Sequence, residues 1–172
     1  MMSNFHLVQR LVLTAALTLF FSLSNAQTPL LTPEKVIQLL PDEIRGFDQS
    51  GDAKGSTMKL GDITYSFCEK NFSNYNKTIK ILLFDFKEAP IMYRQATRRW
   101  ENLHPVESDS LILRMVEMEN CTGWESFNRG SSSAQIFLGV CDRFFLTIFG
   151  EHVDLAVLQK VVADIKPAKF PK

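Results

Sequence analysis

The sequence lacks the features that mark specialised classes of chain. Its 172 residues include 8 glycines, 7 prolines and 3 cysteines, so it is neither collagen-like, nor low-complexity, nor a small scaffold dense in disulfides. Neither charge is in excess, because 19 Lys and Arg balance 19 Asp and Glu. Nucleic-acid binding without sequence preference depends on clustered positive charge, so we expect no nucleic-acid partner. With 45% hydrophobic residues, the composition is that of an ordinary globular domain.

Motifs that carry chemistry are also missing. The sequence has no G-x-S-x-G elbow, no glycine-rich phosphate loop and no C-x-x-C pair, which are the usual signals of hydrolases, nucleotide-binding proteins and thioredoxin-like proteins. His104 and His152 lie in neither an H-x-x-x-H nor a cysteine-rich context, whereas a zinc site needs three or four ligands at such spacing. We therefore expect no metal, no cofactor and no catalytic motif.

The longest apolar run lies at the N-terminus. Arg10 precedes the run Leu11–Phe21, whose 11 residues fall short of the roughly 20 that a membrane-spanning helix needs. The small residues Ser24 and Ala26 stand three and one positions before a cut after Ala26, which is typical of a secretory signal peptide. We expect residues 1–26 to be a signal peptide and residues 27–172 a single periplasmic or secreted domain with no integral membrane segment. The alternative is that residues 1–26 remain as an uncleaved anchor.

Hydrophobic periodicity predicts both helices and strands in the domain. Helices are expected after Thr32-Pro33, Pro90 and Asp154, where apolar residues recur at helical spacing. Gly46–Gly61 has the composition of a loop, with room for a short strand near its end. Strands are expected at Ile63–Cys68, Thr78–Phe86, Leu111–Met118, Thr122–Asn128, Ala134–Val140 and Arg143–Phe149. Since short turns join antiparallel strands, the expected fold class is α+β, with a twisted antiparallel sheet of about six strands, helices packed mainly on one face, and the order α-β-β-α-β-β-β-β-α.

The C-terminal third carries a pattern that resembles a known group of proteins. It consists of Gly139-Val140-Cys141-Asp142-Arg143-Phe144, then Gly150, Val153-Asp154 and Leu158, and Leu39-Leu40-Pro41 matches the opening of the same group. With its strand order, the chain resembles exported bacterial proteins of Mog1/PsbP-like α+β architecture. The resemblance implies that fold and no particular activity. Those proteins usually have glycine where this chain has Cys141, at a turn position that favours Gly, Asn or Asp.

Two groups of side chains are candidates for binding. Leu82, Phe84 and Phe86 form an apolar row on one face of a strand whose other face is apolar too. If helices cover only that other face, the row is free to bind an apolar ligand; burial under the N-terminal helix or the loop 46–61 is the alternative. The second group, on the helix after Pro90, is a possible contact for an anion or a partner, or else a solvated helix face. It consists of Arg94, Arg98, Arg99 and Trp100.

Export would permit disulfides among Cys68, Cys121 and Cys141. If the loop 129–133 is symmetric about Ser131, Cys121 lies opposite Cys141 and the two can form a disulfide. A register shift of one residue would instead point their side chains to opposite faces. Cys68 would remain a free thiol. Its strand neighbours Thr64 and Ser66 are polar, so a reactive thiol stands as an alternative to a buried one.

These observations favour a non-enzymatic binding or accessory module of the cell envelope, whose partner is a protein or an apolar small molecule. The alternative is an enzyme or redox-responsive protein with a dispersed site that uses Cys68 or carboxylates. Candidate carboxylates are Glu117, Glu119 and Glu125, although strands with one solvated face normally carry such residues outward.

Overall fold

The computed structural model describes residues 29–172, so the expected signal peptide and its cleavage site lie outside the described residues. The described part is an α+β fold with nine strands in one open sheet. The strands are β1 (Asp48–Gln49), β2 (Lys54–Leu60), β3 (Ile63–Asn74), β4 (Lys77–Asp85), β5 (Val106–Glu107), β6 (Leu111–Met118), β7 (Cys121–Asn128), β8 (Ser133–Val140) and β9 (Phe144–Glu151). The helices are α2 (Pro33–Ile37), α3 (Pro90–Thr97) and α4 (Leu155–Ile165), with 3-10 helices η1 (Arg98–Asn102) and η2 (Pro167–Lys169). None of these helices is long and apolar enough to cross a membrane.

The prediction of six strands is wrong in number, although the antiparallel α+β class is confirmed. The six expected strands are β3, β4 and β6 to β9, and β1 and β5 add two short edge segments of 2 residues each. The third addition, β2, occupies the polar stretch that composition assigned mainly to a loop. Its seven residues all pair with β3, from Lys54 opposite Glu69 to Leu60 opposite Ile63. Backbone pairing along an edge needs no apolar side chains, so periodicity did not reveal β2.

The strand order joins two halves of the chain. Hydrogen-bonded neighbours run β1-β3-β4-β9-β8-β7-β6-β5, with β2 also paired to β3. Strands β4 and β9 are far apart in the sequence but pair along their length, which places Phe84 opposite Phe145 and Leu83 opposite Leu146. Because residues along a strand alternate between faces, this pairing brings aromatic side chains from both halves onto one face of the sheet.

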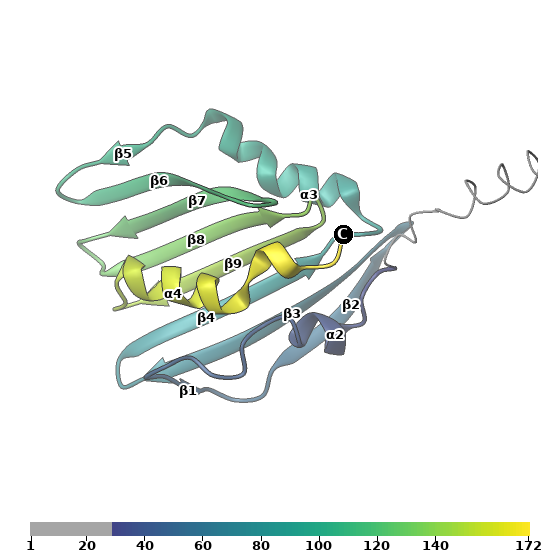
Figure 1. The fold of residues 1–172 in the computed structure, drawn as a ribbon, viewed down its shortest axis with the longest axis horizontal. Coiled ribbons are helices and arrows are strands. Elements are labelled where there is room, and N and C mark those ends of the chain that lie inside the picture. Colours follow the sequence, from purple (N-terminus) through teal and green to yellow (C-terminus); the bar gives the residue numbers. More distant parts are fainter. Residues whose placement is uncertain (1–28) are drawn as a thin grey trace, which may run out of the picture.

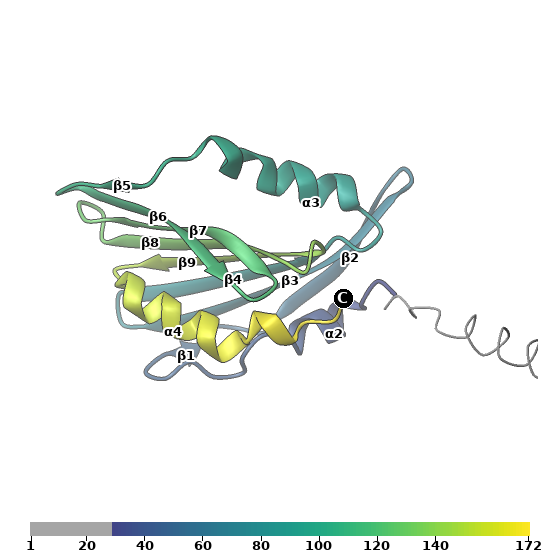
Figure 2. The same ribbon diagram turned by 45° about the horizontal axis from the view of Figure 1, so that its top comes forward.

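The helices cover both faces of the sheet. Figure 2 shows α3 on one side of the strands and α4 and α2 on the other, and Figure 1 shows α4 crossing the sheet beside β8 and β9. A Cβ added at Gly139 would meet Tyr93 of α3, whereas one added at Gly150 would meet Leu158 of α4. Helices α2 and α4 therefore share one face of the sheet, whereas α3, which was expected to pack with α4, lies on the opposite face. An apolar stripe shows that a helix packs on a sheet but does not specify which face it covers.

The main core lies between the sheet and helices α2 and α4. Helix α4 begins after Asp154 and ends before Lys166, which adopts a left-handed φ of 54°. Its buried residues are Leu155, Leu158, Val161, Val162 and Ile165. They pack against the inward residues of the central strands, such as Ile81, Leu138 and Leu146, all fully buried. Burying this stripe is the main reason that the eleven-residue helix forms, because isolated helices of this length are marginal in water.

The inward face of β3 carries polar residues. Ser66, Cys68 and Lys70 are buried on the side of α2, while Tyr65 and Phe67 point to the opposite face. The ammonium of Lys70 donates to the carbonyls of Leu40 and Pro41 and to Asp42, at 3.4, 3.1 and 2.8 Å. These hydrogen bonds satisfy the charge and attach the chain after α2 to the sheet. Polar residues can therefore point inward here because the segment after α2 supplies their partners.

A buried ion pair fixes the end of β4. Asp85 and Arg143 are 0% and 3% exposed, and the carboxylate accepts hydrogen bonds from Arg143 Nε and Nη2 at 2.7 and 2.6 Å. Asp85 also accepts from the backbone N–H groups of Leu31 and Lys87. Arg143 further donates to the carbonyls of Pro29 and Lys172. One buried pair therefore holds the first described residues, the last residues and the turn that leads from β4 into α3.

The predicted disulfide between Cys121 and Cys141 is wrong. The pairing of β7 with β8 places Cys121 opposite Val140, one residue from the assumed register. Asn128 pairs with Ser133, so the loop between the strands holds four residues and its centre lies between residues 130 and 131. Cys141 instead lies in the turn before β9 with φ of 53°, the left-handed conformation that its place in the sequence suggested. All three cysteines are free thiols.

Candidate binding groove under helix α3

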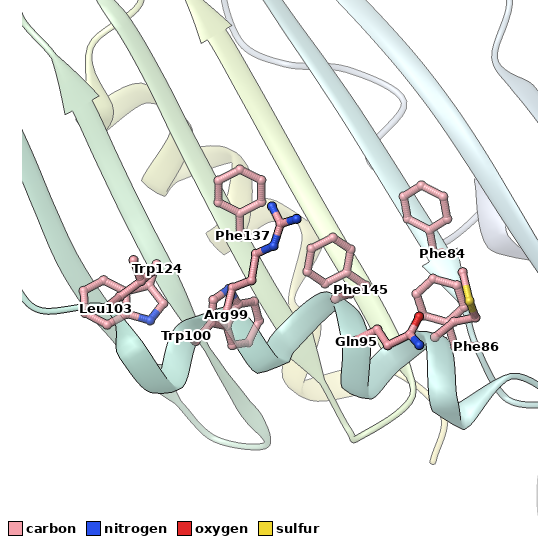
Figure 3. A pocket seen from close by; sticks show the side chains of 11 residues that line it. Phe84, Phe86, Gln95, Arg99, Trp100, Leu103, Trp124, Phe137 and Phe145 are labelled. Atoms are coloured by element: carbon pink, nitrogen blue, oxygen red, sulfur yellow. The ribbon is translucent and has the colours of Figure 1, made fainter.

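An aromatic groove of about 560 Å³ lies between the sheet and the segment α3–η1. Figure 3 shows side chains of the helix, in the foreground, and of the strands behind it around the same space. The sheet contributes residues from β4, β7, β8 and β9, and the helix contributes a single stripe along its length. The lining residues are Phe84, Phe86, Met92, Gln95, Ala96, Arg99, Trp100, Leu103, Trp124, Phe137 and Phe145. We refer to this space as the α3 groove.

Helix α3 covers the sheet without packing down on it. Neither α3 nor η1 contains a buried residue, whereas α4 on the other face contains five. Close contact occurs at Gly139 of β8, where a Cβ would lie 2.5 Å from the Tyr93 hydroxyl oxygen and 3.3 Å from Thr97 Cγ2. The absence of a side chain at Gly139 lets this part of the helix approach the strand. Farther from this contact, the ring and alkyl side chains hold helix and sheet apart, and the groove results.

The floor of the α3 groove is a continuous set of aromatic rings. Phe84 stacks on Phe86 with ring centroids 5.6 Å apart and tilts against Phe145 at 6.3 Å. Phe145 in turn stacks with Phe137 at 6.4 Å and with Trp100 of η1 at 6.1 Å. Contacts of this kind favour offset or tilted rings and contribute about 0.5–1.5 kcal/mol each beyond the area they bury. The floor is therefore apolar, and its rings Phe84, Phe137 and Phe145 remain partly exposed.

Polar groups are few at this site. Gln95 and Arg99 are exposed and project from the helix at the rim of the groove (Figure 3). Arg99 carries the only charge among the eleven lining residues, and no carboxylate is among them. Within residues 29–172, its guanidinium forms no ion pair. The site can therefore bind by apolar contact and hold a negative group, but it presents no acid–base pair.

The structure brings together residues that the sequence placed in two separate groups. Phe84 and Phe86 of the apolar row lie in the same groove as Arg99 and Trp100 of the basic group. Leu82, the third member of the row, lies on the same face of β4 but does not line the groove. The other two arginines of the basic group, Arg94 and Arg98, lie on the outer side of the helix.

Sequence reasoning missed most of the groove. Trp124, Phe137 and Phe145 line it but had been assigned to strands without a role, since aromatic residues on strands are usually core. One local signal was available: Phe137 and Phe145 alternate with the fully buried Leu138 and Leu146, so they must lie on the opposite face of the sheet. That signal becomes useful only when a helix is known to cover the same face.

The thiols do not form a reactive centre. Burial raises the pKa of Cys68 to about 12 and that of Cys121 to about 11, and it also raises the pKa of the half-buried Cys141. The thiolate is the nucleophilic form of cysteine, so all three are poor nucleophiles at neutral pH. Cys68 is fully buried beneath the sheet, on the face opposite the α3 groove. The redox or thiol-enzyme alternative therefore gains no support from the geometry.

The carboxylates do not converge either. Glu125 is buried and structural, because it pairs with Arg114 at 2.9 Å and accepts a hydrogen bond from Gln159 of α4 at 2.8 Å. Glu117 and Glu119 are exposed at the end of the β6–β7 hairpin. In the described part of the chain, no three His, Cys, Asp or Glu side chains cluster so as to hold a metal ion.

Comparison with known proteins relates the chain by fold alone. No protein-family model matches it, and no curated protein matches its sequence. It is similar in structure to the extracellular domain of PknH from Mycobacterium tuberculosis, with a TM-score of 0.52 and 8% identity over 80% of this chain and 95% of that one. A GTP-binding regulator from Thermotoga maritima matches with a TM-score of 0.44 and 12% identity over 77% of this chain and 82% of that one. The resemblance to Mog1/PsbP-like proteins stays a prediction.

Proposed function

We propose that this chain is an exported, non-enzymatic binding module that holds an apolar small molecule in the α3 groove. The observation that carries the proposal is the aromatic floor left partly exposed beneath a helix with no fully buried residue. The volume of about 560 Å³ falls within the range typical of small-molecule sites. Covering such a floor with a ligand removes apolar surface from water, at roughly 25 cal/mol for each Å².

A small ligand suits this geometry better than a protein partner. Stable protein interfaces bury on the order of 800 Å² on each partner over broad surfaces. The α3 groove is instead a space of about 560 Å³ lined by eleven residues, a size typical of a small-molecule site.

Export is supported by two observations that are independent of the groove. Residues 1–26 have the pattern of a signal peptide, and the fold is shared with a domain that is extracellular in another protein. The mass of the protein recovered from cell fractions tests this part. A chain that begins at Gln27 in the exported fraction supports it, and a cytoplasmic chain that retains residues 1–26 contradicts it.

Fluorescence tests the groove directly, because the chain's two tryptophans, Trp100 and Trp124, both line it. A brominated alkyl alcohol, 11-bromoundecanol, quenches tryptophan emission on contact. We expect saturable quenching of the native protein. Emission that is unchanged up to the solubility limit of the alcohol would overturn the proposal.

A matched pair of variants locates the binding. Ala96 of α3 lines the groove, and Ala156 is exposed on α4 at the opposite face. We expect Ala96→Phe to fill the groove and remove the saturable quenching, while Ala156→Phe leaves it unchanged. Equal quenching in both variants would place the alcohol elsewhere. Circular dichroism of both variants confirms that the fold is retained.

A further inference from the structure

We infer that the ligand of the α3 groove is an anionic amphiphile, a single apolar tail that ends in a carboxylate paired with Arg99. The inference rests on the proposed function and adds to it the chemistry of the ligand's head. The observations that carry it are the charge of the lining, the direction of the Arg99 side chain and the apolar stripe that extends from it.

The charge of the lining is complementary to an anion. Arg99 is the one charged residue of the eleven, and its guanidinium has no ion-pair partner in residues 29–172. The nearest acid along the helix, Glu101, lies on the outer side with Arg94 and Arg98. The outer side therefore adds further positive charge, and nothing in the lining offsets the charge of Arg99. A guanidinium binds a carboxylate through two parallel hydrogen bonds, which are stronger than bonds between neutral groups.

The position of Arg99 suits the head of a ligand rather than its tail. In Figure 3 its side chain extends from the helix toward the Phe137 ring, above the aromatic floor. The guanidinium is exposed, so a bound carboxylate keeps contact with water and its desolvation cost stays small.

The tail has an apolar path that starts at Arg99. Met92, Ala96 and Arg99 lie on one stripe of the helix, since they are spaced by four and three residues. Two turns of helix separate Arg99 from Met92, a length of about 10 Å. Below this path lie Phe145 and Phe84. The path is therefore elongated and apolar, which fits an alkyl chain.

Decanoate and 1-decanol provide the test, because they have the same number of carbons and differ in the charge of the head. Dissociation constants are measured at neutral pH by displacement of 11-bromoundecanol from the native protein and two variants. Arg99→Gln removes the charge in the groove. Arg98→Gln removes the same charge from the outer side of the helix and is the matched control. Thermal unfolding of each variant serves as the folding control.

The expected result is specific to one ligand and one arginine. In Arg99→Gln, decanoate binds about 5-fold more weakly, while decanol changes by less than about 2-fold. Arg98→Gln leaves both constants within about 2-fold of the native values. Raising NaCl from about 0.05 M to about 0.5 M weakens decanoate binding to the native protein and not to Arg99→Gln.

Three results would overturn the inference. If decanoate and decanol lose affinity equally in Arg99→Gln, the arginine acts by packing and the head is not recognised. If Arg98→Gln weakens decanoate as much as Arg99→Gln does, the attraction comes from the general charge of the helix. In both cases the proposed function stands, because the groove still binds an alkyl chain. If neither ligand displaces the probe and the probe itself does not bind, the proposed function fails as well.

Discussion

Replacing Asp85 with asparagine tests the role assigned to the buried ion pair. Asp85 is fully buried, and its two oxygens accept four hydrogen bonds, from Leu31 N, Lys87 N, Arg143 Nε and Arg143 Nη2. Asn is nearly the same size, but its NH₂ group is a donor and would face other donors. The substitution also leaves the charge of Arg143 buried without its counter-charge.

The expected destabilisation is about 3–5 kcal/mol, the range seen when one partner of a buried ion pair is removed. The total free energy of unfolding of a domain is typically about 5–15 kcal/mol, so the loss is a large fraction of it. At about 2–4 °C for each kcal/mol in a domain of this size, Tm should fall by roughly 10 °C. The double variant Asp85→Leu with Arg143→Met should be more stable than the single variant Asp85→Leu, because no unpaired charge remains in it.

Urea unfolding, followed by tryptophan fluorescence and far-UV circular dichroism, measures these differences. Asp164→Asn is the control, since Asp164 is exposed on α4 and forms no ion pair in the described residues. A loss below about 1 kcal/mol in Asp85→Asn would show that the pair is not buried as described, and the reasoning would fail.

Three further predictions concern the helix and the thiols. Gly139→Ala should displace α3, because the new Cβ would lie 2.5 Å from the Tyr93 hydroxyl oxygen, and quenching by 11-bromoundecanol should weaken. Cys68 should react with a thiol reagent only after unfolding, because burial raises its pKa to about 12; labelling of the native protein at the rate of a free thiol would contradict this. Stability should fall as pH rises above 9, because Cys68 ionises near the ordinary thiol pKa of 9.0 when unfolded but stays protonated in the fold up to about 12. Urea unfolding should show that, for each pH unit in this range, the free energy of unfolding of Cys68→Ala falls by about 1.4 kcal/mol less than that of the native protein. An equal pH dependence in the two proteins would show that Cys68 is not the cause.

Local patterns predicted the elements that depend on local physics. The strand-like run Leu111–Met118 predicted β6 with both ends correct, and the helix expected after Asp154 is α4. Each of these features depends on residues within one element, a run of strand-forming side chains or an apolar helical stripe, so neighbouring sequence is sufficient to reveal it.

Features that depend on distant partners were not predictable in the same way. The pairing of Phe84 with Phe145 joins strands about sixty residues apart, and no turn between them specifies the register. The face covered by α3 was equally undetermined. The α3 groove depends on the pairing of β4 with β9 and on the face that α3 covers. Its residues could therefore be found in the sequence, but the fact that they lie together could not be predicted.

Lys70 lies on the inward face of β3 because carbonyls at Leu40 and Pro41, which are distant in the sequence, accept its hydrogen bonds. One error came from an assumption of symmetry. The β7–β8 loop holds four residues, with Ser132 in the left-handed conformation, so its centre lies half a residue from Ser131. That small difference changes the register by one and moves Cys121 opposite Val140.

The most direct measurement is isotope-filtered NOE spectroscopy of the native protein with ¹³C-labelled decanoate. The binding site described above requires contacts from the alkyl chain to the ring protons of Phe84 and Phe145, and contacts from the carbons next to the carboxylate to the Arg99 side chain. Ligand contacts confined to α4 or to the outer side of α3, or a complete absence of intermolecular contacts at saturating decanoate, would contradict the assignment of the α3 groove as a binding site.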